Sequence, residues 1–256
     1  MQAISLQSGS NGNCIYVETG GVRLLFDAGI SGIQALKRLE LHSRDIRQID
    51  ALIISHDHSD HTSAMGIYSR KFGIPVYVTK PTLASAARKN KIGDITKLYH
   101  FESGKTLDFG KVSVETVKTP HDGVDGVGFI IDDGNCRLGV MTDLGYVFPE
   151  LVETMNSLDG VFIESNYDPH LLETGPYPLF LKKRIIGSGG HLSNLESAEL
   201  LAGLTSKRLR WACLSHLSET NNSPSVVMKT HRLYNPRKIP LTVASRYEVS
   251  EIFCLE

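Results

Sequence analysis

The sequence predicts an α/β protein (α+β in some schemes) in which two packed mixed sheets carry helices on their outer faces. Strand-like segments dominate residues 1–141, with helical stretches among them, whereas helices and single strands alternate over residues 142–256. Polar residues gather where the predicted strands end, which is typical of layered α/β architectures. The length of 256 residues suffices for one large core, so we expect residues 1–256 to form one domain.

The expected elements begin with a hairpin. Residues 14–17 and 22–26 are apolar strand segments joined through a Gly-Gly turn. Ser31 is then the expected N-cap of a helix that ends at Leu39. The residues expected on the inner face of this helix are Ile33, Leu36 and Leu39.

The apolar segment 51–54, Ala-Leu-Ile-Ile, shows no alternation with polar residues, which predicts a strand covered on both faces. A helix that ends near Gly73 leads to a strand over residues 75–78, and another helix is expected over residues 82–90. Strands dominate from about residue 105 to residue 141. The later expected elements are helices at 150–156, 193–204 and 223–234, and strands at 160–164 and 211–215.

The composition limits the function classes. The formal net charge is −1, so the chain lacks the global basic field of many duplex-binding proteins, although a local basic groove would suffice for nucleic acid. The four cysteines form no CxxC pair, which argues against a zinc ribbon. No signal peptide or membrane-spanning run is recognisable, so we expect a cytoplasmic protein without membrane attachment or an evident obligate protein partner.

The most informative segment follows the 51–54 strand. His56, His58 and His61 lie within six residues, together with Asp60. Two histidines separated by one residue point to the same side of an extended chain, so His56 and His58 can reach one metal ion. The turn that follows offers Asp60 and His61 to a second site. A polar surface loop is the alternative, but it does not account for this spacing.

Further polar residues stand beside predicted strands and helices. His121, Asp143 and His216 follow apolar strands, and His191 precedes a helix. Taken singly, each is explained as a residue that caps or hydrogen-bonds a loop. Two metal ions need more ligands than residues 56–61 supply, and this requirement favours ligand roles for some of the four.

This order of a histidine cluster, a single histidine, an aspartate and a final histidine resembles the metallo-β-lactamase superfamily, along the whole chain. The resemblance implies a four-layer αβ/βα sandwich and a brace for the metal loop in Asp27. It also implies two divalent ions, zinc or manganese, with iron or nickel also compatible. The implied ligands are His56, His58 and His121 for the first ion, Asp60, His61 and His216 for the second, and Asp143 as a bridge.

Several motifs, among them Glu164-Ser165-Asn166 and Gly190-His191-Leu192-Ser193-Asn194, resemble the narrower YycJ/WalJ family, which is related to ribonuclease Z. This resemblance implies a hydrolase of phosphodiesters, an exonuclease that acts on DNA rather than RNA, with a role in DNA repair. It implies that Asp60 orients the attacking water and that Glu164 and His191 deliver a proton to the leaving group. Otherwise His191 only orders its loop and Glu164 pairs with a buried cation.

Substrate contacts are expected in two kinds of segment. Ser8, Asn11 and Asn13 lie in a stretch whose backbone N–H groups could cradle a phosphate, although an ordinary turn explains it equally well. Four basic stretches could line a path for phosphates, with solvated helix faces as the alternative: residues 182–184, residues 207–208 with Arg210, Arg232 with residues 237–238, and residues 88–91.

Other functions share the same ligand set. A thioester or lactone hydrolase of the glyoxalase II kind and a small-molecule phosphodiesterase both remain open. The Glu164 and His191 pair favours a phosphodiester, because an alkoxide leaves poorly unless it is protonated. A metal-stabilised scaffold or sensor without turnover would require a blocked cleft.

Overall fold

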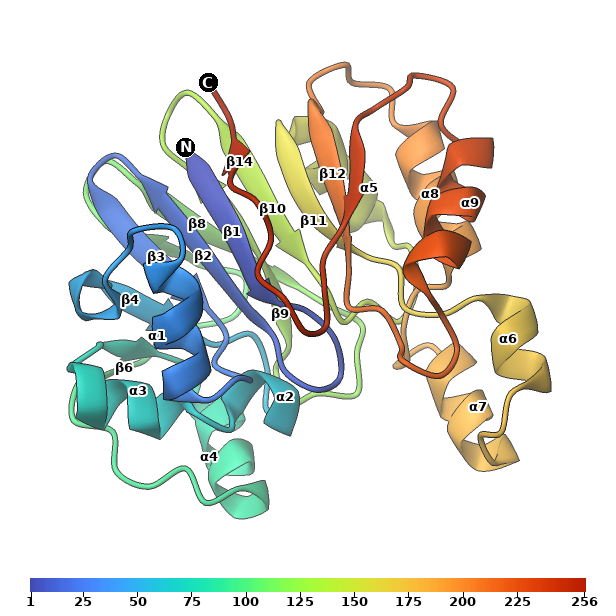
Figure 1. Cartoon of the computed structure of the whole chain (residues 1–256). Coiled ribbons are helices and arrows are strands. Elements are labelled where there is room, and N and C mark those ends of the chain that lie inside the picture. Colours follow the sequence, from blue (N-terminus) through green and yellow to red (C-terminus); the bar gives the residue numbers. More distant parts are fainter.

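The computed structural model describes residues 1–256, and its strands form two seven-stranded sheets that pack face to face (Figure 1). The order in the first sheet is β14 (Phe253–Cys254), β1 (Gln2–Gln7), β2 (Cys14–Thr19), β3 (Val22–Phe26), β4 (Ala51–Ile53), β5 (Val76–Tyr77) and β6 (Leu98–Tyr99). The order in the second sheet is β13 (Leu241–Val243), β12 (Trp211–Ser215), β11 (Gly160–Glu164), β10 (Arg137–Met141), β9 (Val127–Asp132), β8 (Ser113–Lys118) and β7 (Thr106–Asp108).

Both sheets change from antiparallel to parallel pairing at one strand. In the first sheet the change occurs at β3, which pairs antiparallel with β2 and parallel with β4. In the second sheet it occurs at β10, which pairs antiparallel with β9 and parallel with β11. Parallel neighbours need crossover connections, so their carboxyl ends meet at one edge of each sheet, where connecting loops can gather side chains.

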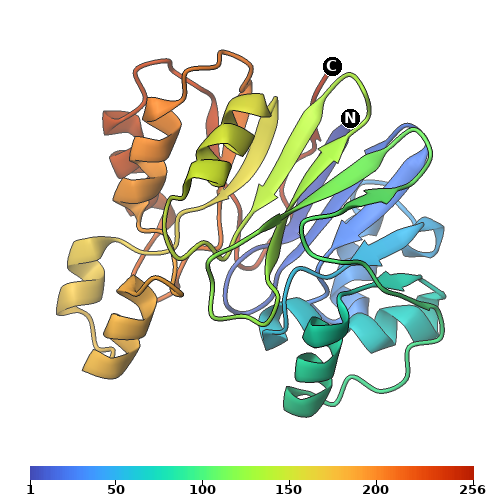
Figure 2. The ribbon, with the colours of Figure 1, turned by 180° about the vertical axis from the view of Figure 1, so that it is seen from behind.

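Helices cover the outer face of each sheet, as Figures 1 and 2 show from opposite sides. The helices are α1 (Gly32–Glu40), the 3₁₀ helix η1 (Ile46–Gln48), α2 (Ser59–Thr62), α3 (Met65–Phe72), α4 (Lys80–Lys89), α5 (Pro149–Ser157), α6 (Pro169–Thr174), α7 (Leu179–Ile186), α8 (Asn194–Gly203) and α9 (Pro224–Leu233). Helices α1, α3 and α4 share a core with the first sheet, and α5, α8 and α9 share one with the second. The predicted α/β sandwich with helices outside is confirmed.

The surroundings of β4 explain why apolar and polar residues do not alternate along this strand. Ala51 and Ile53 belong to the core between the two sheets, whereas Leu52 belongs to the core beneath the helices of the first sheet. Successive side chains of a strand point to opposite faces, and both faces are covered, so every position is apolar.

The helix α1 begins as predicted but presents a different face to the core. The Ser31 hydroxyl accepts from the Gln34 N–H in a capping box. Ile33, however, is 56% exposed, so its predicted place on the inner face is wrong. A Cβ on the buried Gly32 would lie 2.9 Å from the Phe72 ring. The helix therefore packs on α3 through this glycine, which turns Ile33 toward solvent.

Sequence reasoning did not identify the edge strands β13 and β14 or the helices α6 and α7. Both chain termini lie at the end of the sandwich away from α4 and α7 (Figure 1). The terminal residues are tied together, because Leu255 N–H donates to the Met1 carbonyl at 2.9 Å. None of the helices combines the length and the apolar character that crossing a lipid bilayer would require.

The contact between the sheets supports a stability prediction. Phe129 on β9 is 1% exposed, and its ring centroid lies 4.9 Å from that of Phe26 on β3. We expect Phe129→Ala to lower the free energy of unfolding by about 3–5 kcal/mol, because it leaves a cavity between the sheets. Urea unfolding followed by circular dichroism measures this. Phe180→Ala, at a side chain that is 75% exposed, is the control and should change it by less than about 0.5 kcal/mol.

The buried His231 on α9 gives the fold a pH dependence. Its Nε2 lies 3.0 Å from the Ser165 hydroxyl, and burial lowers its pKa from 6.5 to about 4. The unfolded chain therefore binds the proton more tightly than the folded chain. The stability that neutral His231 contributes is complete above pH 6.5 and is lost as the pH falls toward 4.

We expect His231→Gln, which can still bond Ser165, to remove this dependence. Between pH 7.5 and pH 5 the wild-type chain should lose about 2 kcal/mol more unfolding free energy than the variant, since each pKa unit corresponds to about 1.4 kcal/mol. Urea titrations of both proteins at the two pH values measure the difference. If both proteins lost the same unfolding free energy between the two pH values, the pKa of His231 would not be lowered in the folded chain.

Candidate metal centre

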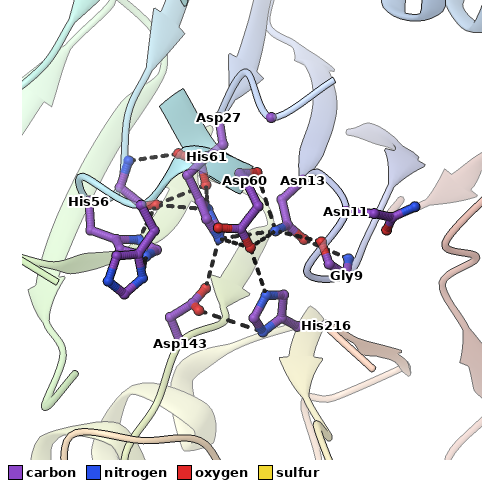
Figure 3. A network of polar contacts seen from close by, with 12 residues as sticks. Gly9, Asn11, Asn13, Asp27, His56, Asp60, His61, Asp143 and His216 are labelled. Atoms are coloured by element: carbon purple, nitrogen blue, oxygen red, sulfur yellow. Dashed lines mark hydrogen bonds and ion pairs between the residues drawn. The ribbon is translucent and has the colours of Figure 1, made fainter. Parts of the chain in front are cut away.

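The predicted metal ligands meet at the edge where the parallel strands end. His56 follows β4, while Asp143 and His216 follow β10 and β12 of the other sheet. Asp27, Asp143 and His216 have φ angles of 64°, 60° and 58°, a left-handed conformation that is rare outside glycine. Such strained backbone persists where the surrounding structure enforces it and is common at functional sites. Figure 3 shows the side chains that converge there.

Three imidazoles form one cluster. His58 Nδ1 lies 3.0 Å from His56 Nε2 and 3.3 Å from His121 Nε2. Burial lowers the pKa of His56 well below its usual value, and it also lowers the pKa of His58. A metal ion binds to the lone pair of a neutral imidazole nitrogen. Three neutral imidazoles whose nitrogens face one another can therefore bind one metal ion together.

The outward nitrogens of this cluster are held by acceptors. His121 Nδ1 lies 2.8 Å from the Gly190 carbonyl, and His58 Nε2 lies 3.3 Å from an Asp122 carboxylate oxygen. Asp122 in turn accepts two bonds from the Arg184 guanidinium, at 2.5 and 3.0 Å. Acceptors at these positions place the ring protons outward, so the converging nitrogens keep their lone pairs for a ligand role.

A second cluster adjoins the first. Asp60 Oδ2 lies 3.5 Å from both His61 Nε2 and His216 Nε2. Burial alone would lower the pKa of His216, but Asp143 and hydrogen bonds to Asp60 and Glu164 raise it to about 10. A cation bound at His216 Nε2 would therefore displace a proton.

Asp143 lies between the two clusters. Its Oδ1 is 3.6 Å from His121 Nε2 and 3.5 Å from His216 Nδ1, and its Oδ2 is 3.3 Å from His61 Nε2. Burial would raise the pKa of Asp143, but the charges of His216 and His61 outweigh burial and hold it well below its usual range.

The surroundings of Asp143 test whether metal ions fit this site. The carboxylate is 4% exposed, and its Oδ2 has no partner in hydrogen-bonding geometry. A buried, unpaired carboxylate oxygen is costly unless a cation or a donor satisfies it. Four overlapping groups of histidine and carboxylate atoms around it each span less than 4.8 Å. The site therefore fits divalent cations on both sides of Asp143.

The loop before α1 supports the second cluster, as expected from the Phe26-Asp27-Ala28-Gly29 sequence. Asp27 Oδ2 lies 2.7 Å from His61 Nδ1, and Asp27 also accepts from the Ser55 N–H at 2.8 Å. A Cβ on Gly29 would lie 1.6 Å from the Asp60 carbonyl oxygen, so only glycine allows this close approach.

The segment 8–13 supports the metal centre from the other side. The Asn13 amide is 5% exposed and lies 3.0 Å from His61 Nε2 and 3.3 Å from Asp60 Oδ2. The buried Ser8 hydroxyl accepts from the His216 N–H at 2.8 Å. These two side chains thus point inward and brace the centre, and their expected contact with substrate stays a prediction. Asn11 is exposed, and its amide donates to the Arg246 carbonyl at 2.9 Å.

Glu164 and His191 form the expected pair. Glu164 is completely buried, and its Oε1 lies 2.9 Å from His191 Nδ1 and 2.8 Å from His216 Nδ1. Its Oε2 accepts from the Leu144 and Leu192 N–H groups. Burial would raise its pKa, but the His191 charge and hydrogen bonds lower it to about 2. Glu164 therefore orients two histidines at once and does not reach solvent.

A polar pocket of about 350 Å³ opens onto the centre, and none of its ten lining residues is hydrophobic. His58, Asp60, Asp143, His191 and His216 are among these lining residues, so members of both clusters and the proposed proton donor share one cavity.

Two cations stand in the walls of this pocket. Lys89 comes from α4 and Arg184 from α7. Lys89 Nζ lies 2.5 Å from the buried Asp57, just as Arg184 bonds Asp122. Sequence reasoning assigned no role to these two aspartates. The available signal was position, since each stands directly beside a motif histidine.

The geometry agrees with the comparisons to known proteins. Residues 22–216 match the family described as the Beta-lactamase superfamily domain. The chain is 37% identical to the exodeoxyribonuclease WalJ of Streptococcus pneumoniae over 221 residues, which cover 85% of this chain and 81% of WalJ. It is 32% identical to the exodeoxyribonuclease YycJ of Bacillus anthracis over 219 residues, which cover 85% of this chain and 82% of YycJ.

Among solved structures, the metallo-β-lactamase fold protein YhfI from Bacillus subtilis superposes with a TM-score of 0.72 at 17% identity. The superposition covers 98% of this chain and 100% of YhfI, so the two share the fold. The chain therefore belongs to the β-lactamase superfamily and, within it, to the family of the exodeoxyribonucleases WalJ and YycJ.

Proposed function

We propose that the chain is a metal-dependent phosphodiesterase, a nuclease that removes nucleotides from DNA. The observation that carries this proposal is the Asp143 carboxylate between two histidine clusters, whose Oδ2 accepts no hydrogen bond and which lines a pocket without hydrophobic residues. The pocket is also lined by Lys89 and Arg184, which pair with Asp57 and Asp122 and keep further N–H groups that can donate to a phosphodiester. Relatives named exodeoxyribonucleases support DNA as the substrate.

The ligand sets follow from the two clusters. His56, His58 and His121 would hold one ion, and Asp60, His61 and His216 the other, with Asp143 shared. Imidazole and carboxylate together suit zinc or manganese, and they also accept iron or nickel. Two such ions, when bound, would polarise the phosphoryl group and promote the ionisation of a water molecule.

The chain's own residues would manage the protons of this hydrolysis. The Asp60 carboxylate lines the pocket and would orient the attacking water. The departing sugar oxygen needs a proton as the P–O bond breaks, and His191 would donate it. Glu164 is a positioning residue, because its Oε1 accepts from His191 Nδ1 and so directs Nε2 to the pocket.

The residues around the pocket also distinguish between the alternative functions. A thiolate leaves a thioester without being protonated, so a thioester substrate would not require the Glu164 and His191 pair that the structure holds beside the pocket. A scaffold without turnover would need a blocked cleft, whereas the cluster residues line an open pocket. Both observations support the phosphodiesterase.

A cleavage assay tests the proposed function. The metal-loaded protein is incubated with single- and double-stranded DNA and RNA, labelled at the 5′ or 3′ end, with added Mn²⁺ or Zn²⁺. His58→Ala is the blank, and His170→Ala, at an exposed histidine of α6, is the matched control. We expect wild type and His170→Ala to remove nucleotides stepwise from one end of DNA, and we expect His58→Ala to remove none. Absence of cleavage by a protein that holds its metals would refute a nuclease.

Asp143→Asn tests the shared ligand. We expect the variant to bind fewer ions than wild type and to lose activity by more than about a hundredfold, because one carboxylate serves both clusters. Mass spectrometry of the dialysed protein counts the ions. Asp94→Asn, at an exposed loop position, is the control and should retain both. Full metal content in Asp143→Asn would show that the two sites do not depend on this residue.

His191→Ala tests the proton donor. We expect the variant to keep its metal ions and to cleave DNA about 10²–10⁴-fold more slowly, the range typical of general acids. Hydrolysis of bis(p-nitrophenyl) phosphate should fall much less, since p-nitrophenolate leaves without a proton. Equal losses on both substrates, or a loss of metal as large as in His216→Ala, would exclude the role of general acid.

A further inference from the structure

The helix α7 (Leu179–Ile186) has an exposed apolar surface without a partner in the chain. Phe180 is 75% exposed, and its neighbour Leu179 is 67% exposed. Figures 1 and 2 show α6 and α7 standing apart from the two sheets, at the same end of the molecule as α4. Ile186, at the carboxyl end of the same helix, is 61% exposed, and exposed apolar side chains that gather on one short helix are a more informative sign of a contact surface than single ones.

The carboxyl end of α7 is fixed to the metal centre. The Ile185 carbonyl accepts from the His191 N–H at 3.0 Å, and the Ile185 side chain is buried against Leu172 and Tyr167. Arg184 bonds Asp122, which itself faces His58. The helix therefore has a defined orientation relative to the pocket.

Phe180 shares a helix face with two cations. Residues three and four positions apart lie on the same side of a helix, so Phe180 is aligned with Lys183 and Arg184. Arg184 lines the pocket, and Phe180 lies one turn farther out, about 6 Å along the helix axis. The basic neighbour Lys182 is excluded from this face, because its ammonium group donates to the Glu173 and Gly175 carbonyls.

We propose that this face of α7 is a nucleotide subsite. Arg184 would bind the phosphate next to the scissile one, and the base of that nucleotide would stack on the Phe180 ring. The inference rests on the proposed function and names its substrate class, an unpaired nucleic-acid strand. The two side chains match the two halves of a nucleotide, a charged phosphate and a flat apolar base.

The subsite has a consequence for substrate choice. A base within a duplex is stacked on both sides and paired, so its face is not available to Phe180. A single strand, or an end that has frayed, offers the free face that stacking requires. The protein should therefore bind single-stranded ends more tightly than blunt duplex ends.

A binding measurement tests the subsite. Fluorescence anisotropy follows a short labelled oligothymidylate with phosphorothioate linkages, which resist cleavage, on the metal-loaded protein. We expect Phe180→Ala to weaken binding about tenfold and Phe180→Trp to retain it, as stacking predicts. Leu179→Ala, at the neighbouring exposed apolar residue on another face, is the control and should stay within about twofold of wild type. An oligonucleotide of abasic sugars should bind wild type and Phe180→Ala alike.

Several results would overturn the subsite. Equal affinity of wild type and Phe180→Ala for oligothymidylate would do so, as would a tenfold loss in Leu179→Ala. Light scattering that shows an oligomer dissociated by Phe180→Ala would assign the face to a second copy instead. Because affinity is measured without turnover, a protein that cleaves nothing still tests the subsite, and a failed nuclease assay alone refutes only the proposed function.

Discussion

The buried carboxylate of Asp143 is the constraint on which the rest of the site depends. It faces His61 from the first sheet and His121 and His216 from the second. Histidines of both sheets therefore interact with one carboxylate. An anion at this depth is tolerated only with compensating positive charge. The surrounding histidines provide part of that charge in the folded chain, and its unpaired oxygen marks where a cation would provide the rest.

A second layer of carboxylates gives the histidines their direction. Asp27 holds His61, Asp122 faces His58, and Glu164 holds both His191 and His216. Each contact fixes which ring nitrogen carries the proton, and thus which nitrogen faces the centre. Glu164 joins a proposed ligand to the proposed proton donor, so the geometry of metal binding and that of proton transfer are set by one buried group.

Much of the centre could be predicted from the sequence because its signals are local. The apolar run before His56 fixes a buried strand, and the spacing of His56 and His58 follows from strand geometry. The inward orientation of Ser8 and the exposure of Phe180 could not be predicted, since each depends on segments far away in the chain. The predicted burial of Ile33 was wrong for a similar reason, because the close packing of α1 on α3 decides which face of α1 is buried.

We propose that the Asp143 carboxylate would be shared by two metal ions between the sheets. The measurement that tests it most directly is a crystal structure of the protein loaded with Mn²⁺ or Zn²⁺, with anomalous scattering to locate the ions. We expect two peaks about 3.5–4 Å apart, one beside His56, the other beside Asp60, with the Asp143 carboxylate touching both. A single peak, or two peaks that Asp143 does not contact, would contradict this account.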